Sequence, residues 1–324
     1  MMTRLAEFMG KIALQACLAC ICLLASARIA RAAQEPAQAS TSGQAAADSG
    51  QPGPSAQESS TAKSSSQVAA KPHSLYRAWR RMADREESSE PDWLSPLATT
   101  SGRIKNELRY DIWRQITPAG STVSTFAGGK GMEFIAAPRV QLLLGIPSYI
   151  SHSAAAPPDG FGDLPLMLKF RIASSNVSEG DYLVTFLLSA TVPTSSAPNG
   201  AGDAVLTPTL AMGKGWGPFD AQTTLGVNLP AGDTPRLGRQ LVWNTTFQYR
   251  ARWKLWPELE ANSTFFKQGP NSGETQTFLT PGLGFGRVRL FHGLRFSTAA
   301  GMQIAVTRFH TYNHRAMLSI RFPF

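Results

Sequence analysis

The last residues of the chain, 314–324, alternate between two kinds of side chain. Apolar side chains occupy every second position from Ala316 to Phe324, while the positions between them include Ser319 and Arg321. A period of two, with one apolar and one polar face, is the pattern of a half-buried strand. Chain ends usually fray into water, so an end on an aromatic residue of the apolar face is unusual for a soluble domain. The pattern therefore predicts that the chain ends within a sheet.

The same alternation is typical of transmembrane barrels, whose strands place apolar residues outward and polar residues inward. The ending resembles the terminal-Phe signal strand of bacterial outer-membrane barrels, with Phe322 and Phe324 as the expected membrane-insertion signal. This resemblance implies outer-membrane lipid and the barrel-assembly machinery as partners. For this stretch alone, the closing strand of a soluble sandwich is the alternative.

The amino-terminal residues 1–32 have the parts of a secretory signal peptide. Arg4 and Lys11 supply a positive region, 12–27 is a short apolar run, and 30–32 reads Ala-Arg-Ala, a suitable cleavage site. The apolar run is shorter than the roughly 20 residues of a spanning helix. We therefore expect secretion through the inner membrane of a Gram-negative cell.

All three cysteines lie in this same segment, at Cys17, Cys20 and Cys22. A lipoprotein signal around Cys20 is an alternative, although Cys17 stands where such a signal needs Leu. Cleavage leaves a mature chain without cysteine, which excludes disulfides and thiolate metal sites. No later stretch stays apolar for the roughly 18 residues of a spanning helix, so helical membrane spans are also excluded.

A segment of low complexity, 33–98, follows the signal peptide. Up to about Pro72 it consists mainly of Ala, Ser, Gln, Gly and Pro. Such a composition buries too little apolar surface to offset the entropy of ordering, so we expect a disordered periplasmic tail. Within it, 75–87 could form one short amphipathic helix, acting as a periplasmic plug or lying on the membrane surface, with plain disorder as the alternative. The barrel is expected to occupy 99–324.

Alternation and turn signals over this region predict an all-β fold, an antiparallel up-and-down transmembrane β-barrel of about twelve strands. Longer polar loops alternate with tight turns, as in barrels with short periplasmic turns and longer outer loops. Unpaired strand edges cannot lie in lipid, so the sheet has to close. The expected strands are 103–116, 122–136, 138–146, 162–172, 182–192, 203–212, 218–229, 240–253, 257–267, 275–286, 293–307 and 314–324.

The net charge of +9 raises the question of a nucleic-acid partner. The basic residues are spread over the strands, one or two on each, without a basic helix or a recognition motif. We therefore exclude nucleic acid and expect the cations to lie in a lumen and near anionic lipid.

Several short Gly-rich pieces resemble the outer-membrane family named for the meta-pathway of phenol degradation. They are Gly160–Asp163 with Leu168–Arg171, Leu229–Asp233, Pro257–Asn262 and Pro281–Gly284. The resemblance covers about Pro91 to the end, whereas the Ala/Ser/Gln tail and the short 136–139 turn depart from the family. It implies a transporter-like barrel that passes small molecules, aromatic or hydrophobic ones among them.

Charged and amide residues on the predicted inner face are the candidates for a constriction. They are Lys169, Arg171, Arg250, Arg252, Glu258, Glu260, Asn262, Arg295 and Arg321. A hairpin that turns at 254–256 would set Arg250 opposite Glu260 and Arg252 opposite Glu258, each pair worth roughly 0.2–1 kcal/mol. Such charges either select anionic or polar-aromatic solutes or form a network that fills a narrow barrel.

An outer-membrane hydrolase is the rival class, and it requires a Ser and a His side by side. His152 lies between Ser151 and Ser153, but neighbouring residues of an extended chain point to opposite sides, and this stretch reads as a loop. We expect no enzyme activity, no cofactor and no metal. The sequence predicts a monomeric passive channel for small molecules, with a structural or surface-interaction barrel of closed lumen as the alternative.

Overall fold

The computed structural model describes residues 72–154, 157–195, 198–290 and 293–324. The predicted signal peptide 1–32 and the predicted tail up to residue 71 lie outside these residues. None of the helices that the described residues form has both the length and the apolar character to cross a membrane.

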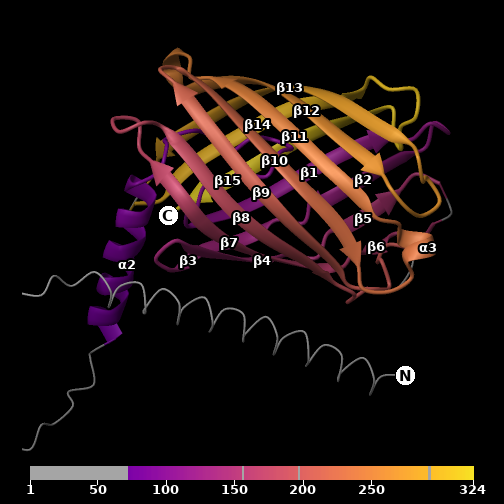
Figure 1. Cartoon of the computed structure of the whole chain (residues 1–324), viewed down its shortest axis with the longest axis horizontal. Coiled ribbons are helices and arrows are strands. Elements are labelled where there is room, and N and C mark those ends of the chain that lie inside the picture. Colours follow the sequence, from indigo (N-terminus) through magenta and orange to yellow (C-terminus); the bar gives the residue numbers. More distant parts are fainter. Residues whose placement is uncertain (1–71, 155–156, 196–197, 291–292) are drawn as a thin grey trace, which may run out of the picture. The chain divides into compact units, whose positions relative to one another are not determined.

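The described residues form a closed antiparallel β-barrel of twelve strands, three of them interrupted (Figure 1). Sequence neighbours pair around the barrel, and β1 pairs with β15 from Glu107↔Pro323 to Ile116↔His314, which closes the sheet. The predicted fold class is confirmed. The strand segments are β1 (Glu107–Ile116), β2 (Thr122–Ala127), β3 (Gly131–Ala137), β4 (Val140–Gly145), β5 (Tyr149–His152), β6 (Gly160–Phe161), β7 (Leu164–Ser175), β8 (Tyr182–Val192), β9 (Val205–Trp216), β10 (Phe219–Pro230), β11 (Gln240–Tyr249), β12 (Leu255–Phe266), β13 (Thr275–Arg289), β14 (Arg295–Ala305) and β15 (His314–Pro323).

The two ends of the barrel differ in their connections. At the end that holds Glu107 and Pro323, which we call the termini end, the connections are 138–139, 176–181, 217–218, 250–254 and 290–294. At the opposite loop end they are 117–121, 153–159, 193–204, 231–239, 267–274 and 306–313. The loop end carries α3 (Thr234–Leu237), and the termini end carries the short 3-10 turn η1 (Arg252–Lys254). Shorter turns at the end that holds Glu107 and Pro323 agree with the predicted asymmetry.

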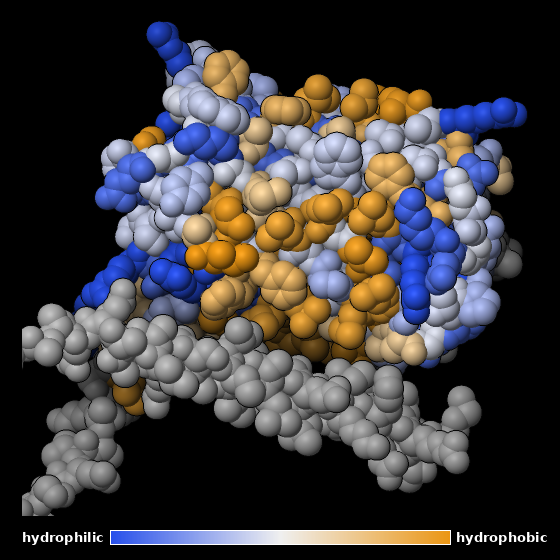
Figure 2. Space-filling view, in the orientation of Figure 1, coloured by the Kyte–Doolittle hydropathy of each residue, from blue (hydrophilic) through white to orange (hydrophobic). Residues whose placement is uncertain are grey.

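The strand period of two places apolar side chains outside and polar ones inside. In β15, Met317, Ser319 and Arg321 are buried, whereas Leu318 is 39% exposed. Apolar residues gather on the visible barrel wall, and hydrophilic residues gather toward its ends (Figure 2). Exposed aromatic residues mark the wall near the termini end: Tyr182, Trp216, Phe219, Tyr249 and Trp253. This distribution matches an apolar band with an aromatic girdle at one boundary.

Some expected boundaries were wrong. The stretch between the expected strands 138–146 and 162–172 contains β5 and β6, because Tyr149 and Ile150 pair with Phe161 and Gly160. The predicted five-residue turn 213–217 is shorter, since β9 continues to Trp216. The predicted strand 122–136 breaks after β2, where Ala127, Gly128 and Gly129 have positive φ.

The amino-terminal part differs most from the expectation. Residues 72–98, which were assigned to a disordered tail, form α2 (Pro72–Ser88) and the start of an extended segment. Residues 89–106, which we call the lumen segment, run from α2 to β1 and are buried at nearly every position. The amphipathic pattern at 75–87 therefore does correspond to a helix. The extended residues after it are ordered because the inside of the barrel supplies their partners.

Candidate functional site

The lumen segment contacts strands around the whole barrel, and these contacts fill its interior. Its polar groups bind side chains of β4, β7, β10, β12, β13 and β15, and the Asn106 side chain accepts from the Ile135 N–H of β3. A wall of twelve strands encloses more space than side chains alone fill, since barrels of about eight strands are already filled by theirs. The chain's own backbone occupies this additional space.

Arginines of the wall bind the carbonyl groups of the segment. Arg321 donates to the carbonyl oxygens of Ser95 and Pro96, the latter at 3.0 Å. Arg109 donates to the carbonyl of Leu97 at 2.8 Å. Buried backbone groups without a partner are costly, and a segment without strand or helix cannot satisfy its own. The inward arginines therefore replace a missing backbone ladder.

A wall carboxylate accepts hydrogen bonds from the backbone amide groups of the segment. Both oxygens of Glu260 accept from the segment, one from the Ala98 N–H at 2.8 Å and the other from the Thr99 N–H at 2.6 Å. Glu260 is fully buried. Hydrogen bonds to a charged group contribute about 1.5–3 kcal/mol each, so this carboxylate is a strong anchor of the segment.

Glycines of the wall make room for the segment's apolar side chains. A Cβ at Gly213 would overlap Trp93, one at Gly284 would overlap Leu94, and one at Gly301 would come within 2.7 Å of a Leu97 methyl group. Trp93, Leu94 and Leu97 are each at most 3% exposed. The strands thus omit side chains where the segment supplies them.

The charges around the lumen segment are mostly paired. Lys105 contacts Glu107 at 2.5 Å, and Lys169 contacts Glu133 at 3.2 Å. Desolvating one charge without its partner would cost several kcal/mol, so this pairing is a condition for filling the lumen.

Helix α2 fixes the segment at the termini end. The Trp79 indole N–H donates to the Ile135 carbonyl at 2.8 Å, and Ala83 packs against Ile104 and Ile135. Arg171 of β7 forms ion pairs with Glu86 of the helix and, at 3.0 Å, with Glu90 of the segment.

Glu90 lies between the helix and the lumen segment and is only 3% exposed. It accepts the Ile104 N–H at 3.0 Å and lies 3.7 Å from Arg103. Burial raises the pKa of Glu90 to about 7, against the opposing effect of Arg103 and Arg171. Its charge therefore changes near neutral pH.

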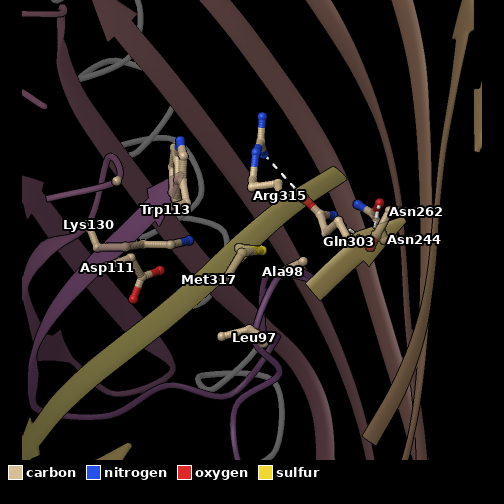
Figure 3. Close-up of a pocket in the computed structure, with 11 residues that line it drawn as sticks. Leu97, Ala98, Asp111, Trp113, Lys130, Asn244, Asn262, Gln303, Arg315 and Met317 are labelled. Carbon is tan, nitrogen blue, oxygen red and sulfur yellow. Dashed lines mark hydrogen bonds between the residues drawn. The ribbon is translucent and has the colours of Figure 1, made fainter. Parts of the chain in front are cut away.

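A chamber remains on the loop side of the lumen segment (Figure 3). Its volume is about 180 Å³, and Leu97 and Ala98 of the segment form one side of it. The barrel lines the rest with Asp111, Trp113, Gly128, Lys130, Asn244, Asn262, Gln303, Arg315 and Met317. This volume exceeds the roughly 10–15 Å³ that one water needs and is smaller than a drug-sized pocket of about 300–1,000 Å³.

Six of the nine predicted constriction residues face the lumen or its filling. Lys169, Arg171, Glu258, Glu260 and Arg321 are buried there, and Asn262 lines the chamber. Arg250, Arg252 and Arg295 are instead exposed near the termini end. Strand β11 ends before Arg250 and Arg252, and β14 begins at Arg295. The alternation of inward and outward side chains therefore does not place these three residues in the lumen.

The predicted pairs across the β11–β12 hairpin were wrong in register. Glu258 lies opposite Gln248 and Glu260 opposite Thr246. Gln248 donates to Glu258 at 2.6 Å. The turn lies earlier than predicted, at 250–254, because Trp253 and Lys254 adopt positive φ there. Each glutamate nevertheless keeps its inward face, since the displacement is an even number of positions.

Sequence reasoning missed Trp113, Lys130 and Gln303 as chamber residues. Lys130 follows two glycines that lie between β2 and β3, and this Gly-Gly pair is the sequence signal that could have pointed to it. The lumen segment was also missed. Trp93, Leu94 and Leu97 are the apolar residues that distinguish it from the tail before it.

Among the described residues, neither Ser151 nor Ser153 hydrogen-bonds to the His152 ring. The His152 ring contacts Asn199 at 3.0 Å, whereas the Ser151 hydroxyl donates to Asp159 at 2.9 Å. The His152 N–H and the Ser151 hydroxyl lower the pKa of Asp159, which caps this loop. Over the ranges that the structure describes, no group of three His, Cys, Asp or Glu residues could hold a metal ion.

Comparison with solved structures finds barrels of bacterial outer membranes. The chain is similar to an outer-membrane channel from Pseudomonas putida F1, with a TM-score of 0.48 and 12% identity over 72% of this chain and 100% of that one. It is also similar to the NanC porin, with a TM-score of 0.44 and 7% identity over 68% and 98%. For Salmonella typhi OmpF in complex with daunomycin, the TM-score is 0.32 and the identity 9% over 68% and 98%. No protein-family model and no curated protein matches the sequence.

Proposed function

We propose that this protein is an outer-membrane barrel channel for small molecules, closed at rest by its own lumen segment. The apolar outer face and the aromatic residues near the termini end fit a lipid environment. The polar inner face fits a hydrated path when the segment is not docked. Export after removal of 1–32, a Gram-negative outer membrane, insertion through Phe322 and Phe324 by the assembly machinery, and a monomeric state belong to the same proposal.

The observation that carries this proposal is how the lumen segment is held. Its backbone is bound mainly by side chains of the wall, notably Glu260, Arg109 and Arg321. Water can replace each of these contacts once the segment leaves, and the wall keeps its own backbone ladder throughout. Release of the segment therefore opens a polar lumen without unfolding the barrel.

A second candidate is a structural barrel whose lumen stays closed. The ion pairs of Arg171 with Glu86 and of Arg287 with Asp92, together with the α2 anchor at Trp79, favour it, because they hold the helix and the segment in place. The two candidates differ only in whether the segment ever leaves the lumen.

The cargo belongs to the proposal as well. The pieces resembling the phenol meta-pathway family point to small aromatic or hydrophobic molecules, whereas the chamber cations point to anions. A small aromatic anion satisfies both indications.

Conductance of the refolded mature protein in planar bilayers tests the proposal. Wild type should show brief, discrete, anion-preferring openings. Glu260→Ala removes the acceptor of two segment amides, so we expect its open probability to rise by about tenfold or more, since 1.4 kcal/mol is a factor of ten. Arg295→Gln, at an exposed position, is the matched control and should behave as wild type. A protein that shows no openings in any variant supports the structural barrel. Unchanged conductance and selectivity in the Glu258→Ala/Glu260→Ala double variant would contradict any role of these carboxylates in the solute path.

A further inference from the structure

The chamber beside Leu97 and Ala98 differs from the rest of the lumen in its charge balance. Elsewhere the inward cations Lys105 and Lys169 contact carboxylates. Among the residues lining the chamber, the carboxylate is Asp111, which is bound by Arg109 at 2.9 Å and by the Ser319 hydroxyl at 2.6 Å. The negative charge available to the chamber is therefore already engaged.

Two cations of the chamber form no direct ion pair with any described residue, and Asp111 and Glu133 attract Lys130 only from a longer distance. Within the described ranges, the Lys130 ammonium makes no hydrogen bond and no ion pair within 4.0 Å, and Figure 3 shows it reaching into the chamber. Arg315 is bound only by neutral groups, since it donates to the amide oxygens of Gln115 and Gln303. Cations withdrawn from water without a directly bound counter-ion are costly, which makes this chamber suited to an anion.

The backbone aims Lys130 inward. Gly128 and Gly129, with φ of 55° and 65°, interrupt the strand and allow it to bend just before Lys130. A Cβ at Gly128 would overlap Asp111 and Trp113. A regular strand with ordinary side chains would thus not build this corner of the chamber.

An aromatic face and three amides complete the lining. The Arg315 guanidinium lies over the Trp113 ring at 5.2 Å from its centroid, and closer to the Tyr312 ring, at 4.0 Å. On the other side, Asn262 donates to Asn244 at 3.2 Å and Gln303 donates to Asn262 at 3.0 Å. The chamber thus offers positive charge, one aromatic surface and neutral hydrogen-bonding groups.

We propose that this chamber binds a small planar organic carboxylate, with its carboxylate at Lys130 and Arg315 and its flat body against Trp113. The volume of about 180 Å³ suits a molecule of about one ring rather than a drug-sized ligand. The inference deepens the proposed function by assigning its cargo a binding site and a carboxylate group, and it rests on the lumen being a solute path. Equilibrium binding, however, does not require conduction.

Isothermal titration of the detergent-solubilised mature protein with sodium benzoate at low salt tests this site. Benzamide is the matched neutral probe, and acetate is the matched probe without a ring. We expect saturable binding of benzoate at one site, with benzamide and acetate each at least tenfold weaker.

Lys130→Met and Arg315→Gln should each weaken benzoate binding by about tenfold or more, whereas Arg295→Gln should leave it unchanged. Heat-modifiable migration confirms that each variant is folded, and the comparison of the three probes on wild type needs no variant.

Absence of saturable binding, equal binding of benzoate and benzamide, or folded chamber variants that bind like wild type would overturn the site. If acetate binds as tightly as benzoate, the proposed contact between a flat ligand and Trp113 is wrong. A barrel that binds benzoate but never conducts would contradict the channel and keep the site, whereas one that conducts without binding would contradict only the site.

Discussion

The wall and the lumen segment are made from the same chain but held together in different ways. Each wall strand exchanges backbone hydrogen bonds with two neighbours, and its register is fixed over many residues, as in β12 and β13 from Leu255↔Phe285 to Phe265↔Thr275. The lumen segment has no such ladder and depends on individual side chains such as Glu260 and Arg321. A ladder fails only cooperatively, whereas a set of separate contacts can be weakened one at a time. The difference predicts variants that release the segment and leave the barrel intact.

The largest effect is expected from filling the space that a wall glycine leaves for the segment. Gly284→Leu would place a side chain where Leu94 packs. Overpacking of this kind typically costs about 1–3 kcal/mol or more, and here it acts on the segment rather than on the ladder. Hydrogen exchange of the 89–106 peptide should become fast, whereas peptides of β13 stay protected. Gly162→Ala, at a glycine without positive φ whose Cβ would meet its nearest atoms at 3.6 Å, controls for the loss of a glycine. Loss of protection throughout the barrel would contradict the proposed independence of wall and segment.

Removal of the Glu260 carboxylate should have the next largest effect. Glu260→Ala leaves the Ala98 and Thr99 amides without their acceptor, at a cost of about 1–3 kcal/mol for each unsatisfied group. Proteolysis of the folded barrel should then cut within the lumen segment at least tenfold faster than in wild type. If cleavage stays at the wild-type rate, the carboxylate does not anchor the segment.

The pH dependence of docking follows from Glu90. Its pKa is about 7 when the segment is docked and near its ordinary 4.5 when the segment is in water. Between these values the docked state binds more protons, so docking is strongest at low pH and weakens as the pH rises toward 7. Each pKa unit corresponds to about 1.4 kcal/mol at most. Exchange of the 89–106 peptide, corrected for intrinsic rates, should be faster at pH 8 than at pH 5.5, and Glu90→Gln should flatten this dependence. The opposite slope would contradict the assignment.

The smallest effect is expected at the helix. Trp79→Phe removes the hydrogen bond to the Ile135 carbonyl and keeps most of the aromatic surface, so we expect a loss of about 1 kcal/mol. The 75–88 peptide should exchange a few-fold faster, while the residues bound to Glu260 remain protected. Tyr76→Phe is the matched aromatic control because Tyr76 is 61% exposed. Release of the whole segment by Trp79→Phe would show that the helix, rather than the wall, holds it.

The sequence predicted the wall better than its contents. Alternation assigns the inner face correctly for Lys169, Glu260 and Arg321, because side-chain direction in a strand is a local property. The position of a residue along the strand is a less local property, because it depends on where the hairpin turns. The unusual positive φ at Trp253 and Lys254 moved the hairpin, so Arg250 lies outside the lumen.

The path of the lumen segment through the barrel could not be predicted from its own residues. Its order depends on partners far away in sequence, such as Glu260 for Thr99 and Arg321 for Pro96. By composition alone, a polar stretch with few apolar residues is expected to remain disordered. The paired glycines at 128–129 were visible in the sequence, but the chamber that they help to form needs strands from across the barrel.

The most direct test of the central claim is to lock the segment to the wall. A Cβ at Gly102 would lie 3.0 Å from the Ala211 Cβ, and the mature chain has no cysteine of its own if 1–32 is removed. The Gly102→Cys/Ala211→Cys variant should therefore form a disulfide after a small adjustment, since Cβ atoms in disulfides are about 3.5–4.5 Å apart. We predict that oxidation abolishes single-channel openings and that reduction restores them, with both single-cysteine variants behaving as wild type. Openings that persist unchanged in the fully oxidised double variant would contradict the claim that movement of the lumen segment opens the barrel.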